Sequence, residues 1–169
     1  GVRISRGARV GDATRVVVSE RVRTDVPLIG PLIPDLDVIQ VERIVDDTVH
    51  LIELRTGPAV LPQLKAVLAD QIRGHFPFPV AGAPHEAALR AGKSFQFRNV
   101  REDPDVPSRT RRLAERFDLN ASTMFVPMLG DGQTVGALVV SRGRTGGFDA
   151  KEVSLLETFA GQAAIAIQN

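Results

Sequence analysis

The sequence predicts a mixed α/β fold of the α+β kind, in which helices pack against an antiparallel sheet. Two hairpins indicate the sheet, because residues 38–55 and 122–142 each contain two strand-like segments joined by a short turn, with strong alternation of apolar and polar residues at 48–55. Segments with helical spacing of apolar residues follow each hairpin, at residues 59–73 and 149–169. Helices with an apolar stripe must cover the sheet to bury that stripe.

The composition is that of an ordinary globular domain. Hydrophobic residues make up 43% of the 169 residues and charged residues 24%, which argues against general disorder. The formal net charge is +1, so the chain offers no strong field to nucleic acid or to an anionic membrane. We therefore expect neither nucleic-acid binding nor membrane contact. The absence of cysteine favours a cytoplasmic location.

Residues 1–36 are expected to form an N-terminal arm or irregular entry segment, and residues 37–169 the folded domain. The stretch 14–24 mixes β-branched residues with a poor helical pattern. Three prolines then prevent a long regular element: Pro27, Pro31 and Pro34. Because the chain begins with Gly1 instead of Met, we expect it to be a fragment of a longer protein.

The first hairpin consists of strands at residues 38–45 and 48–55. Asp46 and Asp47 form its turn, since aspartate tolerates left-handed backbone angles. Residues 59–73 are expected to form the first helix, with Pro62 in its first turn, where proline is tolerated. The apolar positions of this helix are Val60, Leu61, Leu64, Val67, Leu68 and Ile72.

Shorter elements are expected in the middle of the chain. Prolines make residues 75–80 extended, and residues 85–90 form a short helix. Residues 94–100 are predicted to form a strand with its two phenylalanines on one face. Ser108 is the expected N-cap of a helix that runs to about Phe117.

The last third of the chain carries the second hairpin and a final helix. Strands 122–129 and 133–142 are joined by Gly130-Asp-Gly132, which is a strong turn sequence. Asp149 is expected to cap the last helix, with Glu152 completing a capping box. The apolar stripe of this helix contains Val153, Leu156, Phe159, Ala160, Ala163 and Ile167.

Two segments of this last third carry a family resemblance. The sequence MFVPMLGDGQTVGALVV at 124–140 resembles the closing hairpin of a GAF domain. The sequence FDAKEVSLLETFAGQAAIAIQN at 148–169 resembles the terminal helix of GAF modules in bacterial histidine kinases, nucleotide cyclases and related regulators. Upstream, ALRAGKS at 88–94 and NVREDP at 99–104 resemble the middle section of the same family, and the resemblance extends from about Val38 onward.

The resemblance implies a GAF-like central antiparallel sheet of about six strands with helices on both faces. One face is expected to hold a pocket under irregular helices and loops. The other face commonly carries the first and last helices, which can pair between subunits. The proline-rich start departs from the amphipathic first helix that the family leads us to expect.

Candidate ligand-binding residues follow from that implied pocket. Four phenylalanines would line a common cavity and polar side chains would lie near its rim: Phe95, Phe97, Phe117 and Phe125, with Arg98, Asn99, Arg111 and Arg112. An alternative is that the phenylalanines are plain core residues. The arginines would then form a solvated helix face together with Arg109 and Arg116.

The last helix is the candidate for dimerisation and signal relay. Its small and apolar residues continue almost to the end of the sequence, and small residues allow another helix to approach closely. We expect a homodimer whose last helices lie side by side and continue as linkers to an output domain. The residues assigned to this contact are Leu156, Phe159, Ala160, Ala163 and Ile167.

No catalytic or metal-binding set is expected. Without cysteine there is no thiol nucleophile, no thiolate metal site and no cysteine-linked chromophore. His50, His75 and His85 lack the spacing of metal ligands, and nothing marks one of them as a haem ligand. The Asn-Lys-Phe-Asp-Glu signature of cyclic-nucleotide-binding members is absent. The sequence therefore leaves the cofactor unknown.

Three functions remain open at this point. The leading interpretation is a regulatory sensory domain of a signal-transduction protein, which binds an unknown small molecule and relays a signal to an output domain such as a histidine kinase or nucleotide cyclase. The second is a ligand-free structural dimerisation module, and a haem-based sensor is a further alternative. An enzyme is not expected, because no credible catalytic set is present.

Overall fold

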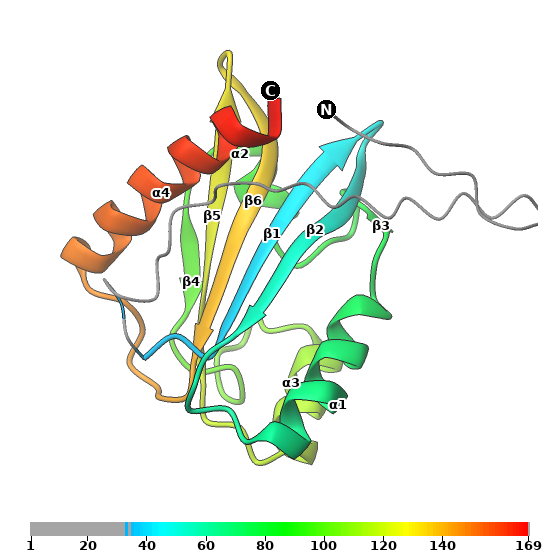
Figure 1. Cartoon of the computed structure of the whole chain (residues 1–169), viewed down its shortest axis with the longest axis vertical. Coiled ribbons are helices and arrows are strands. Elements are labelled where there is room, and N and C mark those ends of the chain that lie inside the picture. Colours follow the sequence, from blue (N-terminus) through cyan, green and yellow to red (C-terminus); the bar gives the residue numbers. More distant parts are fainter. Residues whose placement is uncertain (1–32, 34, 169) are drawn as a thin grey trace, which may run out of the picture.

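The computed structural model describes residues 33 and 35–168 (Figure 1). The elements in this part of the chain are β1 (Val38–Val45), β2 (Thr48–Thr56), α1 (Pro62–Arg73), β3 (Phe78–Pro79), α2 (Glu86–Ala91), β4 (Phe95–Phe97), α3 (Ser108–Arg116), β5 (Ser122–Gly130), β6 (Gln133–Arg142) and α4 (Ala150–Gln168). Most of the expected N-terminal arm lies outside the described residues. Ile33 and Leu36, which are described, are buried in the core of the domain.

The strands form a six-stranded antiparallel sheet in the order β3-β2-β1-β6-β5-β4. The two predicted hairpins meet at its centre, where β1 pairs with β6 from Val38↔Ser141 to Arg43↔Gly136 (Figure 1). This pairing joins segments that lie about a hundred residues apart in the sequence. The prediction of an α+β fold with about six antiparallel strands is confirmed.

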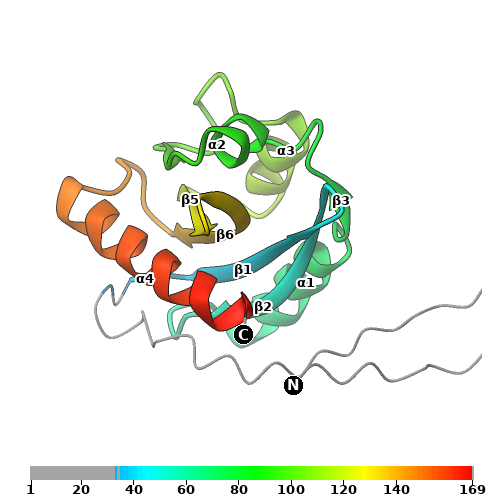
Figure 2. The same ribbon diagram turned by 90° about the horizontal axis from the view of Figure 1, so that it is seen from above.

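Helices cover both faces of the sheet, and a separate core lies on each side. Figure 2 shows α4 on one face and α2 and α3 on the other. Beneath α4, Leu156 and Phe159 pack with Met124, Val126 and residues of the central strands. On the opposite face, a second apolar cluster is built from the following buried residues: Val49, Val80, Leu89, Phe97, Val100, Val106, Ala114, Phe125, Ala137 and Val139.

Both hairpin turns have the backbone that their sequences predict. Asp46 and Asp47 have φ angles of 49° and 57°, and Asp131 and Gly132 have φ angles of 50° and 75°. Two consecutive residues with positive φ twist a two-residue turn in the same sense as the strands that it joins. The acidic and glycine residues at these positions therefore fix the hairpin register.

The sheet depends on a close backbone approach at Gly136. A Cβ atom at this position would overlap the carbonyl oxygen of Glu42 on β1 and lie 2.5 Å from Cε of Met128. Glycine is therefore required for β1 and β6 to pair at this point. The same approach places Glu42 close to the centre of the sheet.

The capping box of α4 is confirmed. The carboxylate of Asp149 accepts a hydrogen bond from the backbone N–H of Glu152 at 2.8 Å. In return, the Glu152 carboxylate accepts one from the backbone N–H of Asp149 at 3.1 Å. These two bonds satisfy donors that the first turn of a helix otherwise leaves free.

Three local predictions were wrong. The first helix begins at Pro62 instead of residue 59, because a proline disfavours helical geometry in the residue before it. The strand predicted at 94–100 ends at Phe97, since the carboxylate of Asp103 captures the backbone N–H groups of Arg98 and Asn99 at 2.6 and 3.1 Å. Ser108 makes no cap, because Pro107 occupies the N-cap position of α3.

Candidate ligand-binding site

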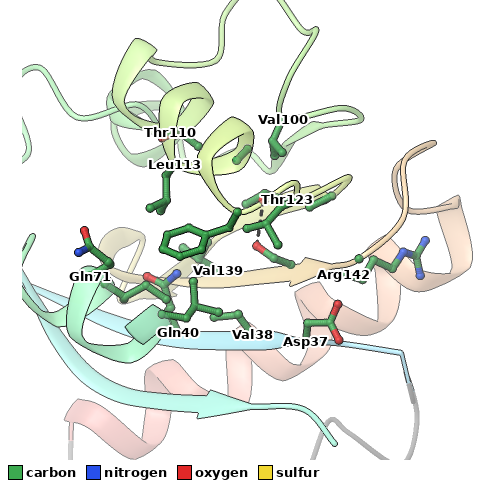
Figure 3. A pocket seen from close by; sticks show the side chains of 18 of the residues that line it. Asp37, Val38, Gln40, Gln71, Val100, Thr110, Leu113, Thr123, Val139 and Arg142 are labelled. Carbon is green, nitrogen blue, oxygen red and sulfur yellow. Dashed lines mark hydrogen bonds between the residues drawn. The ribbon is translucent and has the colours of Figure 1, made fainter. Parts of the chain in front are cut away.

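A pocket of about 790 Å³ lies between α1, α3 and the sheet face opposite α4. Its floor includes Gln40 of β1, Thr123 of β5 and Val139 of β6, while Leu113 of α3 and Gln71 of α1 form part of its walls (Figure 3). Thr123 and Ser141 form a hydrogen bond of 2.9 Å between their hydroxyl oxygens. The pocket thus combines apolar walls with a few polar groups, as small-molecule sites commonly do.

Helix α1 turns its apolar side towards this pocket instead of packing tightly onto the sheet. None of its twelve residues is buried. Leu64, Leu68 and Ile72, which lie at helical spacing on one side, all line the pocket and remain half-buried. Most of the stability of a helix in a protein comes from burying such a stripe, so α1 would gain burial from any molecule that fills the pocket.

Two buried polar residues of the pocket lining, Glu42 and His85, contact each other. Each is only 3% exposed, and Nε2 of His85 lies 3.0 Å from Oε2 of Glu42. When Glu42 is ionised it only accepts hydrogen bonds, and Nε2 of His85 is then the donor. The imidazole also stacks on Phe125, with ring centroids 4.8 Å apart. Glu42 lies in β1, and His85 is the residue before α2. The two are brought together by the tertiary fold.

Arg142 connects the pocket to the first turn of α4. Arg142 is 2% exposed and is among the residues that line the pocket at the end of β6, while its guanidinium points away from the other lining side chains towards Glu152 of α4 (Figure 3). Its guanidinium pairs with the carboxylate of Glu152 through two bonds, one of them at 3.0 Å, and donates to the carbonyl oxygen of Gly147. It also lies over the ring of Phe148, 4.1 Å from the centroid. The hydrogen bonds from Arg142 lower the pKa of Glu152.

Phenylalanine side chains form a compact cluster beside the pocket. Phe95 and Phe125 stack with centroids 4.7 Å apart and planes 5° from parallel. Phe97 meets Phe125 edge-on, with centroids 5.6 Å apart. Offset stacking and edge-to-face contacts are the preferred geometries of aromatic pairs. Of the three rings, only Phe125 lines the pocket.

The predicted ligand-binding residues divide into three groups. Phe117, Phe125 and Arg112 line the pocket. Phe95 and Phe97 belong to the neighbouring core cluster.

The three other polar candidates form turns away from the pocket. Arg98 donates to the carbonyl oxygen of Gly146 at 2.8 Å, and Arg111 donates to that of Asp103 at 2.8 Å. The Asn99 side chain accepts a hydrogen bond from the backbone N–H of Arg101 at 3.0 Å. These contacts hold the segment between β4 and α3.

Sequence reasoning missed the α1 side of the pocket and the Glu42–His85 pair. One signal was available, because alternation along β1 puts Gln40 and Glu42 on the face opposite Val41. Polar side chains on the face that helices must cover indicate something other than a dry core. The partner of Glu42 could not be found in this way, since the two residues are 43 positions apart.

The predicted dimer and relay residues lie against the sheet of their own chain. The five are buried in the core beneath α4: Leu156, Phe159, Ala160, Ala163 and Ile167. The opposite side of the helix carries Ile165, which is 63% exposed. The stripe that suggested a helix pair is therefore occupied by intrachain packing.

Within the part of the chain that the structure describes, no group of three His, Asp or Glu side chains is placed to hold a metal ion. The helices of that part also lack the combination of length and apolar character needed to cross a bilayer.

The chain was compared with known families and structures. The family model for the GAF domain matches residues 42–168. Among curated proteins, none matches the chain.

Three solved structures illustrate the shared fold. The GAF domain/HD domain protein from Geobacter sulfurreducens is 18% identical, with a TM-score of 0.70, and the match covers 87% of this chain and 90% of that one. The GAF3 domain of Slr1393 from Synechocystis, in its photoproduct state, is 18% identical with a TM-score of 0.60, covering 82% and 85%. A type II free methionine-R-sulfoxide reductase from Thermoplasma acidophilum is 12% identical with a TM-score of 0.59, covering 83% and 84%.

Proposed function

The chain belongs to the GAF domain family, and from this premise we propose that it is the sensory domain of a multidomain signal-transduction protein. In this role it binds a small molecule in the pocket between α1 and α3. It relays the binding event through α4 to an output domain such as a histidine kinase or a nucleotide cyclase. We further propose that the protein acts in the cytoplasm.

One observation carries the ligand-binding part of this proposal. Helix α1 has no buried residue, and its apolar side chains line a pocket of about 790 Å³ that is large enough for a small organic molecule. A bound ligand would bury this stripe and complete the core on that face. Ligand binding would thereby stabilise α1 through mass action on the folded state.

Closing the pocket tests this proposal. In the wild-type protein, a library of charged and neutral aromatic fragments is expected to contain compounds that shift the backbone amide signals of α1 and α3. Leu113→Trp places a bulky ring in the pocket and is expected to lower the affinity for those compounds at least tenfold. Glu115→Trp on the exposed side of α3, outside the pocket lining, is the matched control and should leave the titrations unchanged. Pocket binding would be refuted by fragments that bind Leu113→Trp as tightly as the wild type.

The relay part is supported by the contact between Arg142 and Glu152. Arg142 lines the pocket at the end of β6, and Glu152 lies in the first turn of α4. A shift of β6 on ligand binding would therefore act directly on the start of the helix. The buried underside of α4 would carry that movement along the full length of the helix.

A homodimer remains a prediction, and its contact must differ from the one expected from the sequence. The exposed side of α4 around Ile165 is the surface that this helix has available. Ile165→Glu is expected to weaken self-association at least tenfold in sedimentation equilibrium at tens of micromolar. Val67→Glu, which alters an exposed apolar residue of α1, is the control. A wild-type protein that stays monomeric at these concentrations would contradict the dimer.

We propose that this domain is not an enzyme, although one of its structural relatives is a methionine sulfoxide reductase. The chain contains no cysteine and so has no thiol to attack a sulfoxide. Purified protein supplied with free methionine-R-sulfoxide and dithiothreitol is expected to show no turnover above the protein-free background. Sustained production of methionine would overturn this proposal.

The alternative function is a ligand-free structural module. Its specific support is the stacked cluster of Phe95, Phe97 and Phe125, which fills part of the space on the pocket side of the sheet. The fragment titrations above separate the two functions. A pocket that no compound enters would favour the structural module.

A further inference from the structure

We propose that the pocket selects ligands in which an apolar body carries a positively charged, hydrogen-bond-donating nitrogen group, such as an amine or an amidine, and that Glu42 binds this group. The inference rests on the proposed ligand-binding function and adds the chemical class of the ligand. It follows from the buried carboxylate, from the residue that holds it, and from the position of the competing positive charges.

Glu42 has the accepting capacity that this class of ligand requires. Its side chain is 3% exposed and lines the pocket. Oε2 accepts the hydrogen bond from His85, whereas Oε1 receives no hydrogen bond from any residue that the structure describes. A carboxylate has room for several donors, so a ligand nitrogen can be bound without displacing His85. Charge-assisted hydrogen bonds of this kind are stronger than neutral ones.

His85 holds the carboxylate in place. The imidazole is 3% exposed, stacks on Phe125 and meets Phe78 edge-on at 6.1 Å. The bond from Nε2 therefore comes from a ring that neighbouring rings fix in position. A carboxylate with a fixed orientation loses less conformational freedom when a ligand binds.

The positive charges near the pocket lie farther out. Arg109, Arg112 and Arg116 of α3 line its rim and are all exposed to solvent. Exposed charges interact weakly in water and are screened by salt, whereas a buried carboxylate acts through a medium of lower polarity. Arg142 is buried, but its guanidinium is already paired with Glu152. Glu42 is therefore a buried carboxylate of the pocket lining that pairs with a histidine and with no arginine or lysine of the described residues.

The apolar residues of the pocket lining indicate which kind of ligand body would fit there. Leu64 and Leu68 of α1, Leu113 of α3 and Val139 of β6 give the same pocket apolar walls. A flat apolar group would bury well among them. The cationic nitrogen then points inwards, and any anionic substituent stays at the arginine rim.

Three probes with the same ring test the inference without any mutation. Benzamidine carries a positive charge and several donors, benzamide is neutral, and benzoate is negative. In titrations monitored by backbone amide shifts, benzamidine is expected to bind at least tenfold more tightly than benzoate, with benzamide between them. An equal or higher affinity for benzoate would overturn the inference, while binding of benzoate at the pocket amides would still support ligand sensing. If none of the three probes shifts the signals of the pocket amides, both the inference and the proposed ligand binding fail.

Glu42→Gln identifies the responsible group. This change keeps the size of the side chain and an oxygen that can accept from His85, but it removes the charge. The affinity for benzamidine is expected to fall about tenfold or more, and the preference over benzoate should disappear. Glu115→Gln removes an exposed charge from α3 outside the pocket lining and should leave the preference intact. A preference that survives in Glu42→Gln would show that another group selects the ligand.

Discussion

Phe159→Ala is expected to lower the free energy of unfolding by about 3–5 kcal/mol. Phe159 is 6% exposed and packs in the core between α4 and the sheet. Truncation to alanine removes the burial of the ring and leaves a cavity, because the surrounding strands are held by their hydrogen bonds and collapse only partly. The loss is measured by chemical denaturation of the wild type and the variant.

Ile165→Ala is the matched control on the same helix. Ile165 is 63% exposed on the opposite side of α4, so its truncation is expected to change the stability of the monomer, measured at concentrations below those of self-association, by no more than about 0.5 kcal/mol. Equal denaturation midpoints for Phe159→Ala and the wild type would mean that α4 does not pack on the sheet in this orientation. The pair of variants therefore tests which side of α4 belongs to the core.

Arg142→Ala is expected to cost about 3 kcal/mol of stability. Removing one partner of a buried ion pair leaves the other charge poorly compensated, which typically costs 3–5 kcal/mol. We expect the lower end of this range, because the Glu152 side chain remains 21% exposed and can be partly solvated. The substitution also removes the contact with the ring of Phe148.

Arg144→Ala is the control variant, because it removes an ion pair that is exposed instead of buried. Arg144 pairs with Asp35 at 2.7 Å, and its side chain is 61% exposed. Pairs between exposed charges contribute about 0–1 kcal/mol, so this variant should resemble the wild type. If Arg142→Ala lost no more stability than Arg144→Ala, the link between β6 and α4 would have no energetic role.

The ion pair of Arg142 and Glu152 also predicts how the stability of the protein depends on pH. The hydrogen bonds from Arg142 hold the pKa of Glu152 below its ordinary value of 4.5. A carboxylate with a lowered pKa in the folded state stabilises the fold above its ordinary pKa, and this stabilisation is lost as the pH falls through the lowered value. Arg142→Ala should therefore lose less additional stability than the wild type as the pH falls below about 4.5.

Local patterns were sufficient to predict most of the secondary structure. Alternation and turn chemistry located both hairpins, and the positive φ angles of Asp46 and Asp131 agree with the turns predicted there. The capping box of Asp149 and Glu152 marked the start of α4 correctly. These predictions succeed because each depends on residues within a few positions of one another. Order and spacing of such features also indicated the family, and the match over residues 42–168 confirms it.

The interior of the candidate site was decided by contacts between distant segments. The pairing of β1 with β6 and the approach of α2 bring Glu42 to His85, and neither residue is distinctive in its own stretch of sequence. Phenylalanine spacing suggested a common cavity, but only packing determines that Phe125 lines the pocket while Phe95 stacks behind it.

The packing partner of the apolar side of α4 could not be predicted from the sequence either. An apolar stripe specifies that a helix face will be buried, but it does not specify the partner, because the burial of apolar surface is non-directional. The sequence by itself therefore determined the elements, their turns and the family. Tertiary structure decided that the stripe containing Phe159 and Ile167 packs within its own chain, and that the apolar side of α1 borders a pocket instead of a closed core.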